Sequence, residues 1–208
     1  MATPSGFHAR RAALRLLDAV LRRGETLEQA GAPALADVRR AEDKALARAL
    51  ASETLRWLVD LDALIDGATP KPLPPDAKAR QVLRLMLAGW LRLGTPPHAV
   101  VATGLELLSG GPRRLAHGVF AALTRGGATL PPHPTLPGPV AARLDVRADI
   151  VARGLGEPPP LDLSLRDAGE TALWANRLSA DSFAPGHLRL ARGDAVERLP
   201  GFAAVADT

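Results

Sequence analysis

The chain has 208 residues and a mass of 21.8 kDa, with 26 lysines and arginines, 22 acidic residues and no cysteine. The absence of cysteine excludes disulfides, cysteine-ligated zinc, iron–sulfur clusters and every cysteine nucleophile. With 47% hydrophobic residues the chain can bury a core, and no 18-residue stretch is free of charge, so we expect a soluble, cytoplasmic protein.

The basic excess lies in the first part of the chain. Residues 1–126 carry a net charge of +6 and residues 127–208 a net charge of −2, which together give the +4 of the whole chain. Only Lys44, Lys71 and Lys78 are lysines, so most of the cations are arginines. Arginine richness is typical of RNA or phosphate binding, but it also follows from a GC-rich genome, and composition leaves both interpretations open.

Apolar periodicity predicts two helices at the start of the chain. Within residues 10–24, apolar residues recur at i, i+3, i+4, i+7 and i+8, which predicts an amphipathic helix that ends at Gly24. Its apolar stripe consists of Ala13, Leu16, Leu17, Val20 and Leu21. Thr26 followed by Gln29 is the pattern of a capping box, which predicts a second, short helix stopped near Pro33.

Two longer helical patterns follow. Residues 39–66 predict one long helix that ends at Gly67. Its apolar stripe consists of Leu46, Leu50, Trp57, Leu61 and Ile65. Residues 76–94 are apolar around most of the helical circumference, which predicts a helix at the centre of a bundle.

Two more helices complete this part of the chain. Thr95 is expected to cap a helix that runs to residue 108, and Gly104 in its interior predicts a close crossing of two helices. Residues 112–127 predict the last helix. The side chains of this helix expected to face the core are Leu115, Val119 and Leu123. Six helices without a strand pattern predict an all-α bundle over residues 1–127.

Prolines separate this bundle from the rest of the chain. Five prolines lie between residues 131 and 139, and a helix cannot cross such a run. Residues 128–160 are therefore predicted to form a proline-rich linker, with one short helix within residues 140–156.

The remainder, residues 161–208, predicts a small and incomplete α+β segment. One helix is expected over residues 168–178, among short alternating patterns typical of strands. The expected strands are 161–166, 187–192 and 195–199. Such a unit is marginal alone, so we expect the chain to be part of a longer protein. The predicted fold class is mainly α, a helical bundle followed by this linker and segment.

Histidines, acids, glycines and serines form no pattern of a catalytic or metal site. No two histidines stand four residues apart, and the Gly-Gly pairs match no phosphate-binding loop. Asp60, Asp62 and Asp66 cluster at a helix end, where solvated acids are the expected interpretation. Neither Ser109 nor Ser164 stands in the motif of a hydrolase nucleophile. We expect no catalytic residue, no metal and no cofactor in this chain.

The arginines of the first helix form the most informative cluster. Arg11, Arg15 and Arg22 share the face opposite the apolar stripe, which fits either a solvated helix face or an RNA-binding surface. The expected RNA contacts are Arg10, Arg11, Arg15, Arg113, Arg114 and Arg125. Trp57 and Trp90 lie in apolar patterns and are expected to be core residues rather than base-stacking platforms.

The order of these segments resembles a known family. Residues 7–126 resemble a NusB-like domain in four segments, RRAALRLLDAV, ALASETLRWLVDLDALID, VLRLMLAGWLRLGTPPHAVVATGLELL and AHGVFAALTR. The continuation through PPPLDLSLR, ANRL and RLPGF resembles the stretch before the catalytic domain in the RsmB (Sun) family of bacterial methyltransferases. These enzymes make 5-methylcytosine in small-subunit ribosomal RNA, and their catalytic domain has an S-adenosylmethionine-binding fold and two cysteines, which this chain lacks.

The resemblance implies a non-catalytic, RNA-binding portion of such a methyltransferase, which holds ribosomal RNA for a catalytic domain. S-adenosylmethionine is implied only for that missing domain, and no membrane or metal partner is implied. Two other hypotheses stay open, a free-standing NusB-like antitermination factor and a helical protein-interaction module. Residues 130–208 distinguish the first two hypotheses, because an antitermination factor would have no use for them. Salt-dependent RNA binding distinguishes both from the third.

Overall fold

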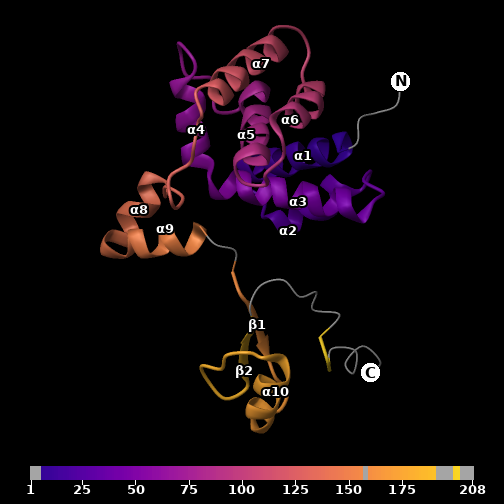
Figure 1. The fold of residues 1–208 in the computed structure, drawn as a ribbon, viewed down its shortest axis with the longest axis vertical. Coiled ribbons are helices and arrows are strands. Elements are labelled where there is room, and N and C mark those ends of the chain that lie inside the picture. Colours follow the sequence, from indigo (N-terminus) through magenta and orange to yellow (C-terminus); the bar gives the residue numbers. More distant parts are fainter. Residues whose placement is uncertain (1–5, 157–158, 191–198, 202–208) are drawn as a thin grey trace. The chain divides into compact units, whose positions relative to one another are not determined.

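The structure, a computed structural model, describes residues 6–156, 159–190 and 199–201 (Figure 1). It divides into two compact units, Met1–Gly156 and Glu157–Thr208. Residues 128–156 therefore belong to the same compact unit as the helical part. The domain boundaries expected at residues 127 and 160 remain predictions from the sequence. No helix in the described ranges is long and apolar enough to cross a membrane.

The first unit is built of helices, as the apolar periodicity predicts. Their bounds in chain order are α1 (Phe7–Arg23), α2 (Leu27–Leu35), α3 (Ala41–Arg56), α4 (Leu58–Gly67), α5 (Lys78–Leu91), α6 (Pro97–Gly104), the 3-10 turn η1 (Leu105–Leu107) and α7 (Gly110–Arg125). The single helix expected over residues 39–66 is wrong, because Trp57 leaves helical geometry at φ −104° and ψ 20° and separates α3 from α4. Among the described residues up to 126 there are therefore seven α-helices rather than six.

Local signals fix the ends of the first two helices. α1 is followed by the C-cap residue Gly24, whose φ of 69° lies in the left-handed region that glycine adopts without strain. α2 begins with the predicted capping box, because the Thr26 hydroxyl accepts from the Gln29 N–H at 3.2 Å and the Gln29 side chain accepts from the Thr26 N–H at 2.9 Å. The helix continues through Pro33 to Leu35, so the stop predicted near Pro33 is slightly early.

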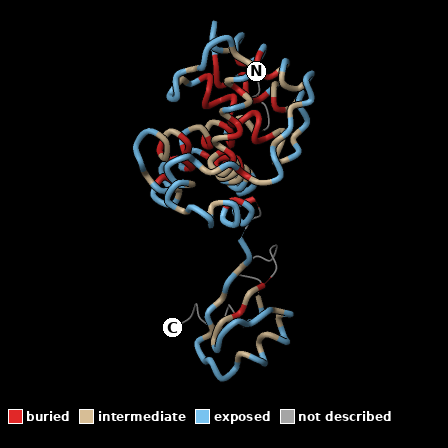
Figure 2. Tube along the Cα trace, turned by 90° about the vertical axis from the view of Figure 1, so that its left-hand side faces the viewer, coloured by how far each residue is buried: buried red, intermediate tan, exposed pale blue. Residues whose placement is uncertain are grey.

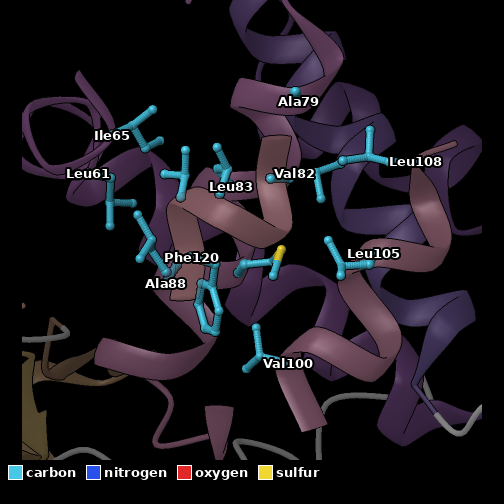
Figure 3. Close-up of a cluster of buried hydrophobic side chains, with 14 of the residues drawn as sticks. Leu61, Ile65, Ala79, Val82, Leu83, Ala88, Val100, Leu105, Leu108 and Phe120 are labelled. Carbon is cyan, nitrogen blue, oxygen red and sulfur yellow. The ribbon is translucent and has the colours of Figure 1, made fainter. Parts of the chain in front are cut away.

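Helix α5 lies at the centre of the bundle, as its apolar circumference predicts. Every residue from Ala79 to Gly89 is buried, and α1, α3, α4, α6 and α7 pack around the helix (Figure 1). Figure 2 shows buried residues concentrated inside the helical unit. Figure 3 shows Leu61 of α4, Leu83 of α5 and Phe120 of α7 among the side chains of the larger core cluster. Removal of a large side chain from this cluster would leave a cavity.

Gly104 marks a close crossing of α6 and α5, as predicted. A Cβ at Gly104 would lie 2.6 Å from Met86 Cγ and 3.0 Å from Met86 Sδ. We expect Gly104→Ala to lower the free energy of unfolding by about 1–3 kcal/mol, because an overpacked core must shift side chains or backbone. Gly118 on α7 is the matched control, since a Cβ there meets nothing within 4 Å, and Gly118→Ala should stabilise by about 0.5–1 kcal/mol. Urea denaturation measures both, and equal effects would contradict the expectation.

Three details of α6 and α7 differ from the expectations. Thr95 does not cap α6, because the N-cap is Pro96, without a side-chain hydrogen bond. The helix ends at Gly104 and is followed by η1, so it does not run to residue 108 as one α-helix. Leu115 is 37% exposed rather than part of the core, because α7 packs through other residues. The buried residues of α7 are Ala116, Val119 and Phe120.

Ion pairs join α4 to α5, so the prediction of solvated acids is wrong. Arg84 Nε and Nη2 donate to the two carboxylate oxygens of Asp62 at 2.7 and 2.6 Å. Arg80 pairs with Asp62 at 3.0 Å and with Asp66, and its Nε donates to the Leu73 carbonyl at 3.0 Å. Burial lowers the pKa of Arg80, but hydrogen bonds to Asp66 and Asp62 outweigh this effect and the pKa is raised. These aspartates are therefore structural.

The proline-rich segment after α7 is docked on α4. Asp60 is buried and accepts hydrogen bonds from both the N–H and the hydroxyl of Thr135, at 2.9 and 2.6 Å. Pro134 is also buried, and its Cδ would lie 3.4 Å from a Cβ at Gly156. Arg92 Nη2 donates to the Gly156 carbonyl at 3.4 Å. The segment predicted as an extended linker is therefore held against the bundle near residue 135 and again at its end.

Two short helices lie within this docked segment. They are α8 (Gly138–Leu144) and α9 (Ala148–Gly156), separated by the 3-10 turn η2 (Asp145–Arg147). The single helix expected within residues 140–156 is wrong, because Asp145 adopts a positive φ of 47° and interrupts it.

The second unit is a small α+β segment, as predicted. β1 (Leu161–Ser164) pairs antiparallel with β2 (His187–Leu190). The 3-10 turn η3 (Ala168–Glu170) leads into α10 (Thr171–Leu178), which contacts β2. Of the strand expected over residues 195–199, only Leu199 lies among the described residues.

Candidate nucleic-acid interface

The outer face of α1 carries two arginines that the structure brings together. The helix buries its other face, made of Ala12, Ala13, Leu16 and Leu17. Arg11 and Arg15 lie one turn apart on the outer face and both approach Asp37, in the connection between α2 and α3, with N–O distances of 3.9 and 2.9 Å. Their side chains are 40% and 42% exposed, so both guanidinium groups can still contact a ligand in solution.

Arg10 does not join this surface, contrary to the expected cluster. The residue is only 8% exposed, and its Nη1 donates to the Gly6 carbonyl at 3.2 Å. Burial lowers the pKa of Arg10, and the charge of Asp43 on α3 partly offsets this effect. Consecutive residues of an α-helix point about 100° apart, so Arg10 lies at the side packed on α3 while Arg11 faces outward.

A groove of about 480 Å³ lies beside the C-terminal half of α1. Arg15, Arg22 and Arg23 line it from α1, and Lys78 lines it from the first turn of α5. Asp18 also lines the groove and pairs with Arg22 at 3.0 Å and with Arg23 at 3.3 Å. Asp76 is the other acid of the lining, and Arg15 and Arg23 also pair with Asp37 and Glu25, at 2.9 and 2.5 Å. The arginines of the groove therefore already have acidic partners, with which a bound phosphate would have to compete.

Lys78 belongs to this surface although the sequence pattern did not indicate it. Lys78 lies far from the arginines of α1 in the sequence, in a segment that predicts the start of the central helix. Only the packing of α5 against α1 brings it beside Arg15. A non-local contact of this kind leaves no periodic signal in one sequence, so spacing could not have found it.

The arginines of α7 differ in the partners they already have. Arg113 donates to the Leu105 carbonyl at 2.6 Å and to the Glu106 carboxylate at 3.0 Å, which ties the start of α7 to η1. Arg114 and Arg125 are exposed, and no ion pair involves either of them within the ranges that the structure describes. Of the three expected contacts on this helix, Arg114 and Arg125 are therefore the more available for an RNA phosphate.

These surfaces offer charge and hydrogen-bond donors. A guanidinium group can donate two parallel hydrogen bonds to one phosphate, and exposed arginines are typical of backbone contacts to nucleic acid. Among the described residues, no group of three or more histidine or acidic side chains is placed to hold a metal ion. The arrangement therefore supports binding of an anionic polymer.

Comparisons with known proteins agree with the helical architecture. A family model, that of the NusB family, matches residues 8–111. No protein with a curated description matches the chain. Two solved structures are each 20% identical, with a TM-score of 0.52, and cover 58% of this chain. They are described as "Crystal Structure of Antitermination Factors NusB and NusE in complex with dsRNA" and "Crystal Structure of a Plectonemic RNA Supercoil", with 96% and 94% of their chains covered.

A further solved structure matches both units of the chain. It is described as "Crystal Structure of PH0851", with 12% identity and a TM-score of 0.53. The match covers 97% of this chain but only 52% of the other, so this chain spans about half the length of that protein. At these identities the likeness shows the fold alone.

Proposed function

Because this chain belongs to the NusB family, we propose that its helical unit binds RNA through the outer face of α1 and the adjoining groove. The single observation that carries the proposal is the exposed pair Arg11 and Arg15 on the net-basic part of the chain. The two NusB-like structures support it, since both descriptions name RNA. Phosphate contacts from these arginines would position an RNA strand without reading its sequence.

We further propose that the RNA is small-subunit ribosomal RNA and that the chain serves a cytosine-5 methyltransferase of the RsmB (Sun) family in the cytoplasm. The support is the sequence order after the bundle and the match to a chain about twice as long that includes counterparts of both units. Under this proposal the catalytic domain supplies the nucleophile and binds S-adenosylmethionine, because this chain has no cysteine. The described units hold and orient the RNA.

A free-standing antitermination factor is the second candidate. It is favoured by the two NusB-like structures, whose chains are covered almost completely. The same matches leave more than a third of this chain without a counterpart, and the second unit would then need a separate role. Preference for small-subunit ribosomal RNA over other RNAs favours the methyltransferase proposal, whereas equal binding of both favours the second candidate.

The double variant Arg11→Ala, Arg15→Ala tests the RNA-binding proposal. Each phosphate contact with a single strand releases counterions worth about 0.7 in the slope of log K against log salt, so the slope should flatten by about 1.4. Fluorescence anisotropy with a ribosomal RNA fragment at several salt concentrations measures this slope. Lys71→Ala, which removes an exposed cation outside α1 and α7, is the control and should leave the slope closer to that of the parent.

Two outcomes would decide against the α1 surface. An unchanged slope in a folded double variant would remove α1 as the contact and leave Arg114 and Arg125 as the candidates on α7. Binding by the parent that does not depend on salt would contradict phosphate recognition altogether.

A further inference from the structure

Among the residues that the structure describes, the outer edge of β1 pairs with no other strand. Leu165 N–H donates to the Gly186 carbonyl at 2.8 Å, which continues the β1–β2 ladder by one residue. In an antiparallel pair, successive residues point their backbone groups alternately toward and away from the partner strand. The N–H groups of Leu161 and Leu163 therefore point toward β2, and those of the residues between them point away.

The far side of β2 confirms this alternation. Arg189 and Asp181 exchange two backbone hydrogen bonds, at 2.7 and 2.9 Å, on the side of β2 away from β1. Arg189 stands opposite Asp162 in the hairpin register, so the backbone groups of Asp162 must point outward as well. Asp162 and Ser164 thus present two N–H groups and two carbonyls at the outer edge of β1. Within the described residues, no hydrogen bond reaches these four groups.

The sequence of this edge is complementary to itself. Residues 161–165 read LDLSL, with leucines alternating with polar residues around Leu163. A second copy of this strand, run antiparallel and centred on Leu163, would place each leucine opposite a leucine and Asp162 opposite Ser164. No like charges would face each other, and four backbone hydrogen bonds would form.

We propose that β1 of a second copy of this chain adds to this edge, so that two hairpins form one four-stranded antiparallel sheet. The apolar face offers room for the added leucines, because Leu161 and Leu163 are only partly buried. A cavity of about 390 Å³ lies beside Leu163 and is also lined by Leu165 and Trp174, among other residues. Backbone hydrogen bonds give affinity to such strand addition, and pockets for alternate side chains give it specificity.

The contact is small, so the association is weak. Stable complexes bury about 1,200–2,000 Å² in total, and two five-residue edges supply less than that. We expect half of the chains to be dimeric at a total chain concentration of roughly 0.1–1 mM. The proposal is independent of RNA binding, because it concerns only the second unit.

Sedimentation equilibrium of the full chain between about 10 µM and 1 mM tests the proposal. Ser164→Pro removes an outward N–H without touching a β1–β2 hydrogen bond, so this variant should stay monomeric. Ser164→Asp places two carboxylates opposite each other and should also stay monomeric. Ser164→Thr keeps the N–H and the hydroxyl and is the matched control, expected to associate like the parent.

The outcomes separate this edge from other surfaces. A monomeric parent at 1 mM would overturn the proposal and would leave the edge for a strand of another polypeptide. Association of Ser164→Pro and Ser164→Asp to the parental extent would overturn it too, since the contact would then run elsewhere. Far-UV circular dichroism of each variant identifies any that fail to fold.

Discussion

Replacing Trp57 by alanine is expected to destabilise the helical unit by about 3–5 kcal/mol, the range for removal of a large buried aromatic side chain. Trp57 is 1% exposed and packs in the larger core cluster at the junction of α3 and α4. The guanidinium of Arg92 also lies 4.6 Å from the centroid of its ring. The variant therefore opens a cavity and removes the aromatic face on which Arg92 rests.

Urea denaturation followed by circular dichroism measures this loss. Trp174→Ala is the matched control, because Trp174 belongs to the second unit and should leave the helical transition in place. Trp90→Ala should cost less than Trp57→Ala, because Trp90 is only partly buried, although its ring meets Phe120 edge to face at 5.7 Å. A Trp57→Ala midpoint and slope equal to those of the parent would contradict the structure of the core.

Removal of Arg84 is the second change with a large expected effect. Arg84→Met should destabilise the helical unit by about 2–4 kcal/mol, because it leaves the Asp62 carboxylate without its two-point partner. The expected loss lies below that for a fully buried pair, since the Asp62 side chain is 26% exposed and water can reach it.

The double variant Arg84→Met, Asp62→Leu separates two contributions to the loss of stability. One is the loss of the ion pair, and the other is the cost of leaving the Asp62 carboxylate without Arg84. In Arg84→Met the Asp62 carboxylate keeps only its contact with Arg80 at 3.0 Å. Replacing both Arg84 and Asp62 removes this incompletely paired carboxylate, so the double variant should recover part of the stability lost in Arg84→Met. Chemical denaturation of both variants measures the difference. A double variant less stable than Arg84→Met would contradict this expectation, because it would mean that Asp62 stabilises the unit through Arg80 even without Arg84.

The sequence predicted the elements whose signals are local. The capping box of Thr26 and Gln29, the stop at Gly24 and the buried circumference of α5 all depend on residues within one or two helical turns. Gly104 was also informative, because glycine inside an apolar helix needs a packing reason, which Met86 supplies. These features were therefore predicted correctly.

Features that depend on distant partners were not predictable from one sequence. The apolar stripe of residues 39–66 continues through Trp57, so the break between α3 and α4 has no local signal. The sequence pattern predicts that Asp60 and Asp62 are solvated. In the structure Thr135 binds Asp60 and Arg84 binds Asp62, and both partners are distant in the sequence. The prolines correctly predicted that residues 128–137 form no helix. They did not predict that this segment is docked on the bundle.

The candidate RNA surface also combines features that local spacing predicts with features that depend on tertiary packing. Helical spacing correctly placed Arg11 and Arg15 together on an exposed face. It placed Arg10 at the edge of that face as well, whereas the packing of α1 on α3 buries it. Periodicity defines faces of one helix, and the neighbours that cover those faces come only from the tertiary structure.

The measurement that tests the α1 surface most directly is the RNA affinity of the variant Asp37→Asn. Asp37 partly neutralises Arg11 and Arg15, so its removal should tighten binding of a ribosomal RNA fragment by about 2–5-fold at low salt, the scale of exposed ion pairs. Glu42→Gln removes an exposed acid that pairs with Arg40 outside this surface and is the control. Anisotropy titration at low and high salt should show a gain for Asp37→Asn that shrinks with salt and is larger than any gain for Glu42→Gln. Equal or weaker binding by folded Asp37→Asn would contradict the assignment of RNA binding to α1.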